Sequence, residues 1–247
     1  LTIQLRYLSI NLEKHLLGNH LFCNGKALLF GGLIFQGNEA NTWYKIGLNI
    51  LENELPEQVL KDGGNFELSP MYHGIFLEDL LDIVNIHQSY NKKLPSKVNS
   101  SILNMIDWLK TMNHPDGNIS FFNDATYGVS PPLADLVNYA LILNIELKTE
   151  AMQNLTYLKS SGYARVEKND FISIIDLANI GPDYLPGHGH ADALSFELSI
   201  FSKRVIVNSG ISTYEIGRDR HYQRGTSSHS TITIDEENSS EVWGGFR

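Results

Sequence analysis

Two histidines and an aspartate lie close together in the segment 187–192, which reads Gly-His-Gly-His-Ala-Asp. Imidazole is the side chain whose ordinary pKa lies nearest to neutrality, and it is also a common metal ligand. His188 and His190 point to the same side of the chain if the backbone is extended. The segment leads directly into the apolar run 193–198, which is not typical of a simple surface turn. We therefore expect it to carry acid–base or metal chemistry.

Two other segments add polar donors and a phenol. Asn19 and His20 stand at an expected break between helices, where an asparagine alone is commonly a cap residue. Ser-Pro at 69–70 predicts a helix start that puts Tyr72 and His73 in the first turn. A free phenol has a pKa of about 10, and we expect the helix dipole and nearby cations to lower the pKa of Tyr72. Tyr72 would then suit proton transfer, although packing on neighbours is the commoner use of a tyrosine.

A basic segment follows the histidine motif. Residues 203–224 carry five lysines and arginines against two acidic residues, although the whole chain has a formal net charge of −9. The arginine fork suits carboxylate or sulfate groups. The candidates for contact with an anionic ligand are Arg220, Tyr222, Arg224 and, from the tyrosine segment, His73. A solvated charged surface would explain any single one of them equally well.

The elements that position these residues differ between the two parts of the chain. Helical apolar spacing dominates the first two thirds. Helices are predicted in the opening 17 residues and over 20–35, 42–60, 70–89, 96–111, 133–143 and 150–158. Successive apolar helices joined by short loops favour antiparallel helical hairpins.

At Gly162 the apolar period changes from about 3.6 to 2. Strands over 163–166 and 171–175 are expected to pair across a turn. Further strands are predicted over 194–201, 205–207 and 231–234. The predicted fold class is α+β, with a helical domain at 1–160 followed by an antiparallel sheet domain at 161–247.

Composition excludes several classes of protein. The net charge of −9 argues against nucleic-acid binding. Cys23 is the single cysteine, which excludes an internal disulfide and a cysteine-based zinc knuckle. No apolar run is long enough to cross a bilayer. The first residues read as the middle of an element and the last ones stop without a visible finish, so we expect a piece cut from a longer protein.

Taken together, these segments resemble the heparinase II/III family of polysaccharide lyases. The resemblance covers nearly the whole chain and is strongest at GNHLFCNGKALLFGGLIFQG, DGGNFELSPMYHGIFLEDLLD, GHGHADALSFEL and RHYQRGTSSHSTITID. It implies the second half of an (α/α) toroid followed by the start of an antiparallel β-sandwich. It also implies an acidic polysaccharide as the partner and a periplasmic or secreted location in a bacterium.

Such lyases cut a uronic-acid polymer by β-elimination. A base removes the proton on C5, negative charge spreads into the C6 carboxylate, and the O4 leaving group receives a proton. The carboxylate must therefore be neutralised by donors placed where the charge develops. The resemblance assigns this task to Asn19 and His20, the catalytic phenol to Tyr72, and the partner base to His188.

The resemblance also implies a zinc site, and no organic cofactor. His190 and His229 match two of the ligands, whereas the position of the third ligand, an aspartate, is occupied in this chain by Asn208. A neutral amide oxygen is a poorer zinc ligand than a carboxylate. Either the metal is absent, or Asp192 or Glu197 compensates, or hydrogen bonds hold the site. A bound zinc would be structural and would fix the histidine loop.

Two other functions stay open at the level of sequence. A glycoside hydrolase on the same kind of toroid would need two carboxylates flanking the bond, for which Glu67 with Glu78 or Asp79 is the best local pair. A catalytically impaired protein that binds or assembles polysaccharide is favoured by Asn208. The sequence does not fix the uronic polymer, the mode of cleavage or the oligomeric state.

Overall fold

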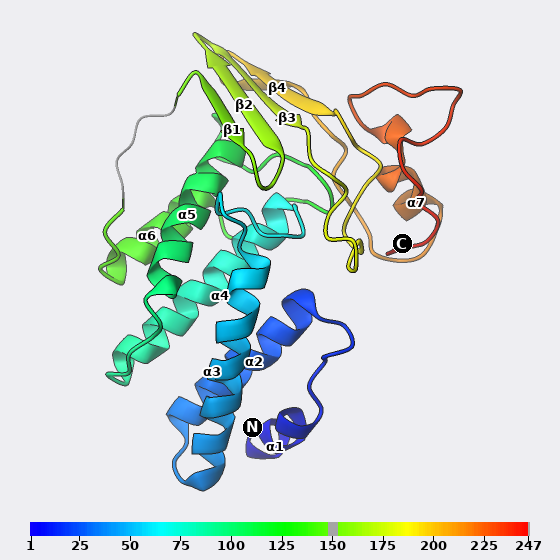
Figure 1. The fold of residues 1–247 in the computed structure, drawn as a ribbon. Coiled ribbons are helices and arrows are strands. Elements are labelled where there is room, and N and C mark those ends of the chain that lie inside the picture. The colour runs from blue at the N-terminus through cyan, green and yellow to red at the C-terminus, as the bar shows by residue number, and fades with distance from the viewer. Residues whose placement is uncertain (148–152, 247) are drawn as a thin grey trace.

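The structure is a computed structural model that describes residues 1–147 and 153–246. Within these residues a group of packed helices precedes an antiparallel sheet, and a short helix follows it (Figure 1). The helices are α1 (Thr2–Ile10), α2 (Gly18–Ile34), α3 (Asn38–Gln58), α4 (Pro70–Ser89), α5 (Lys97–Met112), α6 (Leu133–Ile142) and α7 (Arg218–Arg224). The strands are β1 (Leu155–Leu158), β2 (Tyr163–Lys168), β3 (Phe171–Asp176), β4 (Phe196–Ile200) and β5 (Lys203–Ile206), which neighbour one another in chain order. The α+β class is confirmed.

The start of α4 follows from the Ser-Pro pair. The Oγ atom of Ser69 accepts a hydrogen bond from the backbone N–H of Tyr72 at 3.2 Å, and Pro70 occupies the first helical position. Tyr72 is thereby held in the first turn, as predicted. The same hydroxyl donates to the backbone carbonyl of Asp124 at 2.6 Å. One serine thus fixes both the start of α4 and a loop between α5 and α6.

Helices α2 and α3 approach each other closely. An added Cβ atom at Gly47 would lie 2.7 Å from the backbone oxygen of Gly25, and one at Gly25 would lie 2.7 Å from the side chain of Ile50. The two helices can pack this closely only because both positions lack a side chain. At the other end of α3, the Gln58 amide donates to the backbone oxygen of Gly18 at 2.9 Å. These contacts hold the first turn of α2, where Asn19 and His20 lie.

The main core runs from the helices into the sheet. Trp108 of α5 is fully buried and donates its indole N–H to Ser161 Oγ at 2.8 Å. Its ring stacks on His73 at 4.3 Å and packs edge-on against Tyr163 of β2 at 5.8 Å. Because helical and sheet residues share this core, the two parts of the chain are held in contact at this junction.

The sheet face that meets the helices is partly polar. Arg165 of β2 is 5% exposed and donates from Nη1 to the backbone oxygens of Thr111 and Asn113. Glu197 and Ser199 of β4 are buried on the same side of the sheet. Buried groups of this kind require partners, so this junction is specified by hydrogen bonds as well as by apolar packing.

Most predicted elements are found, and two are wrong. The predicted helix at 150–158 begins partly outside the described residues, and its last four residues form β1, paired with β2 from Leu155 opposite Val166. The predicted strand at 231–234 is irregular, because Ile232 and Ile234 are exposed and no described strand lies beside it. The sheet therefore includes β1, which lies before the predicted domain boundary at 160. No helix within the described residues has the length and apolar character needed to cross a membrane.

Candidate active site

A phenol and an imidazole meet between the helices and the sheet. The rings of Tyr72, from α4, and His188, from the loop before β4, have centroids 3.9 Å apart and planes tilted by 30°. The hydroxyl of Tyr214 lies 3.0 Å from the hydroxyl of Tyr72. The structure therefore brings together two predicted site residues from distant parts of the sequence, and adds a second phenol that the sequence analysis missed.

Asp124 joins both histidines of the motif, although no sequence pattern singled it out. It accepts hydrogen bonds from His188 Nδ1 and His190 Nε2, each at 2.8 Å, and from both terminal nitrogens of Arg220. Burial alone would raise the pKa of Asp124, but these hydrogen bonds outweigh it and hold the pKa well below its usual range. Because an ionised carboxylate only accepts, His188 donates from Nδ1, and its Nε2 carries the lone pair in the neutral ring.

The pKa of Tyr72 differs from the sequence expectation. Burial raises it to about 12, and the hydrogen bond from Tyr214 only partly opposes this change. Among nearby charges, Asp124 and Glu67 act in the raising direction and Arg220 in the lowering direction. The expectation that the helix dipole and nearby cations would lower the pKa of Tyr72 is therefore wrong. Tyr72 keeps its proton at neutral pH and suits the role of an acid.

A cleft of about 470 Å³ opens beside His188, whereas Tyr72, behind that ring, is not among the described residues that line it. The cleft is lined by residues from the start of α2, the turn before α4 and the loop before β4. Its polar lining consists of His15, Asn19, His20, Glu67, Tyr184 and His188. The predicted neutralising pair Asn19 and His20 thus shares one cleft with His188.

The carboxylate pair that a hydrolase would need is not assembled in this cleft. Glu67 is the single carboxylate among the described residues that line it. Asp79 instead forms an ion pair with Lys26 at 2.6 Å on the α2–α4 contact. Glu78 does not line the cleft either. This arrangement gives no support to two carboxylates flanking one glycosidic bond.

A buried cluster behind the histidine loop has the composition of a metal site. Ligand atoms of His190, Asp192 and His229 lie within 4.8 Å of one another. His190 Nδ1 has no hydrogen-bond partner among the described residues. The backbone of Gln223 approaches the His229 ring, but neither ring nitrogen has a partner of normal geometry there. Burial lowers the pKa of His229 to about 3, so its ring is neutral and can bind a metal.

Of the two carboxylates that were candidates to replace the missing aspartate, only one reaches the cluster. Asp192 is part of it. Glu197 is not, because its oxygens accept from His114 and from the backbone N–H groups of Phe121 and Asn208. Asn208 is 1% exposed, and its Nδ2 has no partner within the described part of the chain. An amide nitrogen cannot bind a cation, whereas the unsatisfied ring nitrogens of His190 and His229 beside Asp192 fit one.

Three residues that were predicted to contact the substrate are buried, so these predictions are wrong. His73 is 0% exposed, because it accepts from the Asn65 backbone and bonds the Met105 carbonyl inside the core. Arg220 and Arg224 are each 1% exposed. Their guanidinium groups hold the site from within, Arg220 through Asp124 and Arg224 through the backbone oxygens of the histidine loop and the C-terminal segment.

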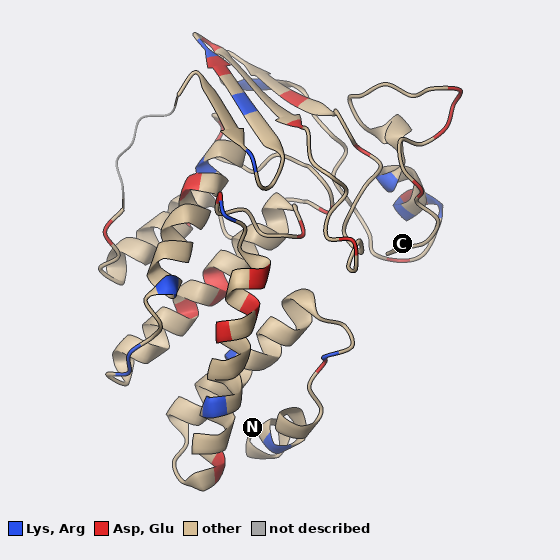
Figure 2. Ribbon diagram, viewed as in Figure 1, with Lys and Arg blue, Asp and Glu red and all other residues tan. Residues whose placement is uncertain are grey.

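Tyr222 is the one predicted substrate contact that lies at the surface. It is 60% exposed on α7, where Figure 2 shows basic residues close to the C-terminal segment. Its contact with a substrate stays a prediction. The other aromatic residue that sequence reasoning missed is Phe246, which stacks on Tyr214 at 5.9 Å and borders the cleft.

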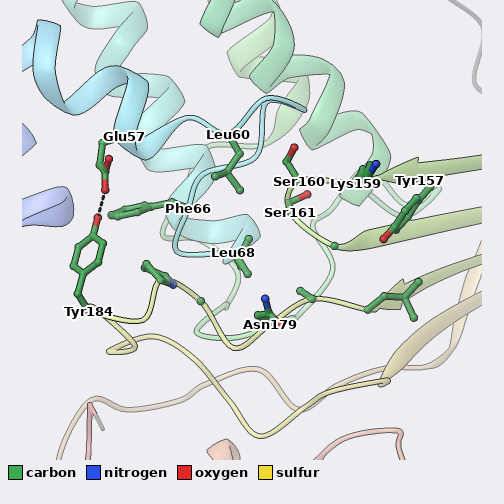
Figure 3. Close-up of a pocket in the computed structure, with 15 residues that line it drawn as sticks. Glu57, Leu60, Phe66, Leu68, Tyr157, Lys159, Ser160, Ser161, Asn179 and Tyr184 are labelled. Atoms are coloured by element: carbon green, nitrogen blue, oxygen red, sulfur yellow. Dashed lines mark hydrogen bonds between the residues drawn. The ribbon is translucent and has the colours of Figure 1, made fainter.

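A second pocket of about 460 Å³, drawn in Figure 3, shares the lining residue Tyr184 with the cleft. It is formed by the end of α3, the β1–β2 turn and the loop 177–184. The Tyr184 hydroxyl donates to Glu57 at 2.5 Å at its edge, and Tyr184 lines both spaces. The lining of this second pocket, within the described residues, contains no histidine. Because His188 lines the cleft and not the second pocket, we place the candidate active site in the cleft.

An α+β protein with a phenol in contact with an imidazole that lines a polar cleft is equipped for proton transfer at a bound ligand. Comparison with known proteins gives the family. The description "Heparinase II/III N-terminus" matches residues 2–142, and "Heparinase II/III-like, C-terminal" matches residues 151–247. The chain belongs to the heparinase II/III family.

Named relatives support the same assignment. The chain is 27% identical to a heparin-sulfate lyase of Pedobacter heparinus, covering 95% of this chain and 38% of that protein. It is 25% identical to a heparin-sulfate lyase of Bacteroides stercoris, covering 93% and 39%. A crystal structure of heparinase III shares the fold with a TM-score of 0.83 at 20% identity, covering 96% and 42%. The chain thus spans well under half the length of the relatives it matches.

Proposed function

We propose that this protein is a polysaccharide lyase that cleaves a uronic-acid-containing polymer by β-elimination. The names of the relatives support a polysaccharide substrate. The observation that carries the proposal is the contact between the rings of Tyr72 and His188, with His188 lining the same cleft as Asn19 and His20. A proton donor, a proton acceptor and a group of polar donors are the parts that the elimination requires.

His188 acts as the base in this proposal. Asp124 holds its Nδ1–H, so the lone pair on Nε2 is available to the cleft. Nε2 takes the proton from C5, the C5–H electrons form the C4=C5 double bond, and the C4–O4 bond breaks. The guanidinium group of Arg220 balances the negative charge of Asp124.

Tyr72 acts as the acid. Its raised pKa keeps the proton on the phenol at neutral pH, and O4 takes this proton as the C4–O4 bond breaks. The reaction leaves a proton on His188 and a phenolate on Tyr72. Loss of the proton from the imidazole and return of a proton to the phenolate restore both groups for the next cycle.

Asn19 and His20 neutralise the C6 carboxylate. Both lie in the first turn of α2, where backbone N–H groups and the positive end of the helix dipole favour an anion. Side-chain donors there would stabilise the negative charge as it spreads from C5.

The helices and the sheet are proposed to be parts of a larger toroid and a larger β-sandwich. The face of the sheet turned away from the helices supports this proposal. By register it carries apolar residues that are half-buried or exposed, namely Leu155, Tyr157, Val166, Phe171, Ile175, Phe196, Leu198 and Ile200. A second sheet packed on this face would bury them.

A zinc ion held by His190, Asp192 and His229 is proposed as a structural cross-link. The unsatisfied ring nitrogens support it. When bound, the ion would tie the histidine loop to the segment after α7 and hold His190 against Asp124. The expected result is zinc in the purified protein, measured by plasma mass spectrometry, and its loss in Asp192→Asn. The Asn208→Asp variant should retain the zinc ion or bind it more tightly. Zinc content unaffected by Asp192→Asn would contradict this ligand set.

The lyase proposal is tested by incubating the full chain with heparan sulfate, alginate, chondroitin and hyaluronan. Ultraviolet absorbance of the new C4=C5 bond is expected with at least one polymer. Tyr72→Phe should lower kcat by about 100-fold or more, because the proton donor is lost, while binding is retained. Tyr90→Phe, at an exposed position after α4, is the matched control.

Each other outcome identifies a different function. New reducing ends without ultraviolet absorbance would show a hydrolase. Retained polymer with neither signal would show a binding protein. Unchanged turnover in Tyr72→Phe would reject the role of the phenol.

A further inference from the structure

The carboxyl group of Glu67 is a buried group in the cleft that has no role in the mechanism above. Its side chain is 2% exposed, and Oε2 has no hydrogen-bond partner among the residues described. This oxygen lies 3.6 Å from His188 Nε2, the atom proposed to take the C5 proton. Folded proteins rarely leave a buried carboxyl oxygen without a partner. Its position in the cleft lining indicates that a ligand supplies the partner.

The local backbone holds this carboxyl in place. The next residue, Leu68, has φ 58, a left-handed conformation that costs free energy in a residue with a side chain. The carbonyl of Leu68 accepts from the Tyr163 hydroxyl at 2.7 Å and from Asn123 at 3.0 Å, which fixes the turn. On the other side, Oε1 of Glu67 lies so close to Gly18 that an added Cβ there would be 2.9 Å away. Oε1 is therefore packed against α2, and Oε2 lies on the side of the His188 ring.

The charges around Glu67 decide which form the carboxyl takes. Burial raises the pKa of Glu67, and Asp124 adds to the rise. His188, the backbone amide of Asn19 and His20 act in the lowering direction without cancelling the effect of burial. Asp124 is already ionised on the far side of the His188 ring, so a second carboxylate here would be opposed.

The two forms of Glu67 would have opposite effects on the reaction. An ionised carboxylate would repel the uronate. A carboxylic acid avoids this repulsion. It also offers an O–H donor inside a buried site, where a hydrogen bond to an anion is strong.

We propose that Glu67, in its carboxylic-acid form, is a further catalytic group, whose Oε2–H donates a hydrogen bond to the C6 carboxylate of the bound uronic acid. This inference rests on the proposed lyase function. The donor acts beside Asn19 and His20 and strengthens as charge moves from C5 into the carboxylate. The proton stays on Glu67 throughout, so the transfers by His188 and Tyr72 are unchanged.

The test compares three variants on a natural and a neutralised substrate. Glu67→Gln keeps the size and a donor without a charge, whereas Glu67→Ala removes the donor. Glu52→Ala, exposed on α3, is the control. The substrates are heparan sulfate oligosaccharides and their uronate methyl esters, followed by ultraviolet absorbance.

On the acid substrate Glu67→Gln should stay close to wild type, and Glu67→Ala should lower kcat by about 100-fold. On the methyl ester, which has no charge to neutralise, Glu67→Ala should stay close to wild type. If Glu67 had a merely structural role, Glu67→Ala would lower kcat equally on the acid substrate and on the methyl ester. If Glu67→Ala does not fold, Glu67→Asp replaces it in the test. Its side chain is shorter by one methylene group, so it should also lower kcat on the acid substrate and not on the ester.

Equal loss of activity in Glu67→Gln and Glu67→Ala would overturn the inference, because an ionised carboxylate would then be required. Equal loss on acid and ester substrates would also overturn it. Both results leave the lyase function intact. If the wild-type protein forms no unsaturated product from any of the four polymers, the proposed function fails and this inference fails with it.

Discussion

Tyr214 shows how a single residue from the sheet half of the chain acts on the helical half. Its hydroxyl lies 3.0 Å from that of Tyr72, its ring stacks on Phe246 with planes 10° apart, and the Arg220 guanidinium lies 5.2 Å from its ring centroid. These contacts fix the ring and thereby the direction of the hydrogen bond. The hydrogen bond also lowers the pKa of Tyr72 in opposition to burial. Tyr214 therefore orients the proposed acid and keeps it from becoming still weaker.

Tyr214→Phe should lower kcat by about threefold to tenfold, because a hydrogen bond of about 1 kcal/mol that orients the acid is lost. KM should change little, since the ring and its stacking are kept. Steady-state kinetics on the best polymer measures both constants, with Tyr90→Phe as the exposed control. An unchanged kcat, or a loss confined to KM, would show that Tyr214 does not act through Tyr72.

The sequence predicted the position of a site residue only where a recognisable motif surrounds that residue. The His-Gly-His run and the Ser-Pro helix start placed His188 and Tyr72 correctly in their elements. Asp124 lies in an irregular loop, where no periodicity marks a buried carboxylate. Arg220 and Arg224 were expected to face a ligand because sequence reveals charge but not direction. Their burial depends on partners that are distant in the sequence.

At the scale of elements, the loop between α5 and α6 is attached to the sheet through one buried carboxylate. Glu197 of β4 accepts from the Phe121 backbone at 2.8 Å and from His114 Nε2 at 2.7 Å. It also accepts from the Asn208 backbone at 3.1 Å. Arg204 adds hydrogen bonds to the carbonyls of the same loop. Because this loop carries Asp124, the position of the histidines depends on the loop's attachment.

Glu197→Ala should lower the free energy of unfolding by about 3 kcal/mol, because it leaves buried donors and a buried histidine without their acceptor. Urea unfolding measures this change. Amide hydrogen exchange should also accelerate over residues 119–128, where the loop loses its anchor. Glu167→Ala is the matched control, because Glu167 pairs with Arg165 at 3.1 Å but is 35% exposed, and its loss should cost under about 1 kcal/mol. Equal losses in both variants would contradict a special role for Glu197.

Elements with a local signal were predicted, and elements that depend on distant partners were not. The β2–β3 hairpin follows from alternating apolar residues and a short turn, and its register runs from Tyr163 opposite Asp176. The segment that forms β1 has helical apolar spacing, yet pairing with β2 decides its structure. The segment 231–234 has the composition of a strand, but its apolar side chains Ile232 and Ile234 are exposed and do not pack on the described residues. Propensity is overridden by tertiary context in both cases.

At the scale of the whole molecule, the site forms only where the two halves of the chain meet. Figure 2 shows acidic residues along the later part of α3 and basic residues on α7. The acidic residues of α3 repel an anionic polymer and the basic residues of α7 attract it. Electrostatic steering therefore favours approach from the α7 side. A net charge of −9 alone indicates none of this. Local charge therefore matters more here than the total.

The junction between the halves also predicts how stability depends on pH. His73 lies 0% exposed beside Trp108, with Nδ1 accepting from the Asn65 backbone at 3.1 Å and Nε2 bonded to the Met105 carbonyl at 2.9 Å. Only the neutral ring satisfies both bonds. Burial accordingly lowers the pKa of His73 from 6.5 to about 3, and the hydrogen bond to Met105 opposes this only partly. In the unfolded chain the ring binds a proton below its ordinary pKa, whereas in the folded chain it does not.

The free energy of unfolding should therefore fall as the pH falls from 6.5 towards about 3, by about 1.4 kcal/mol per pH unit from this residue once the unfolded ring is fully protonated. His73→Gln, which keeps a donor and an acceptor but does not titrate, should be less stable at neutral pH and show a shallower slope. Urea unfolding of both proteins between about pH 7 and pH 5 measures the slopes. His221→Gln, exposed on α7, should keep the wild-type slope. If His73→Gln has the wild-type slope as well, His73 is protonated in the folded state, and the hydrogen bonds that join Asn65 to α5 are not those of a neutral ring.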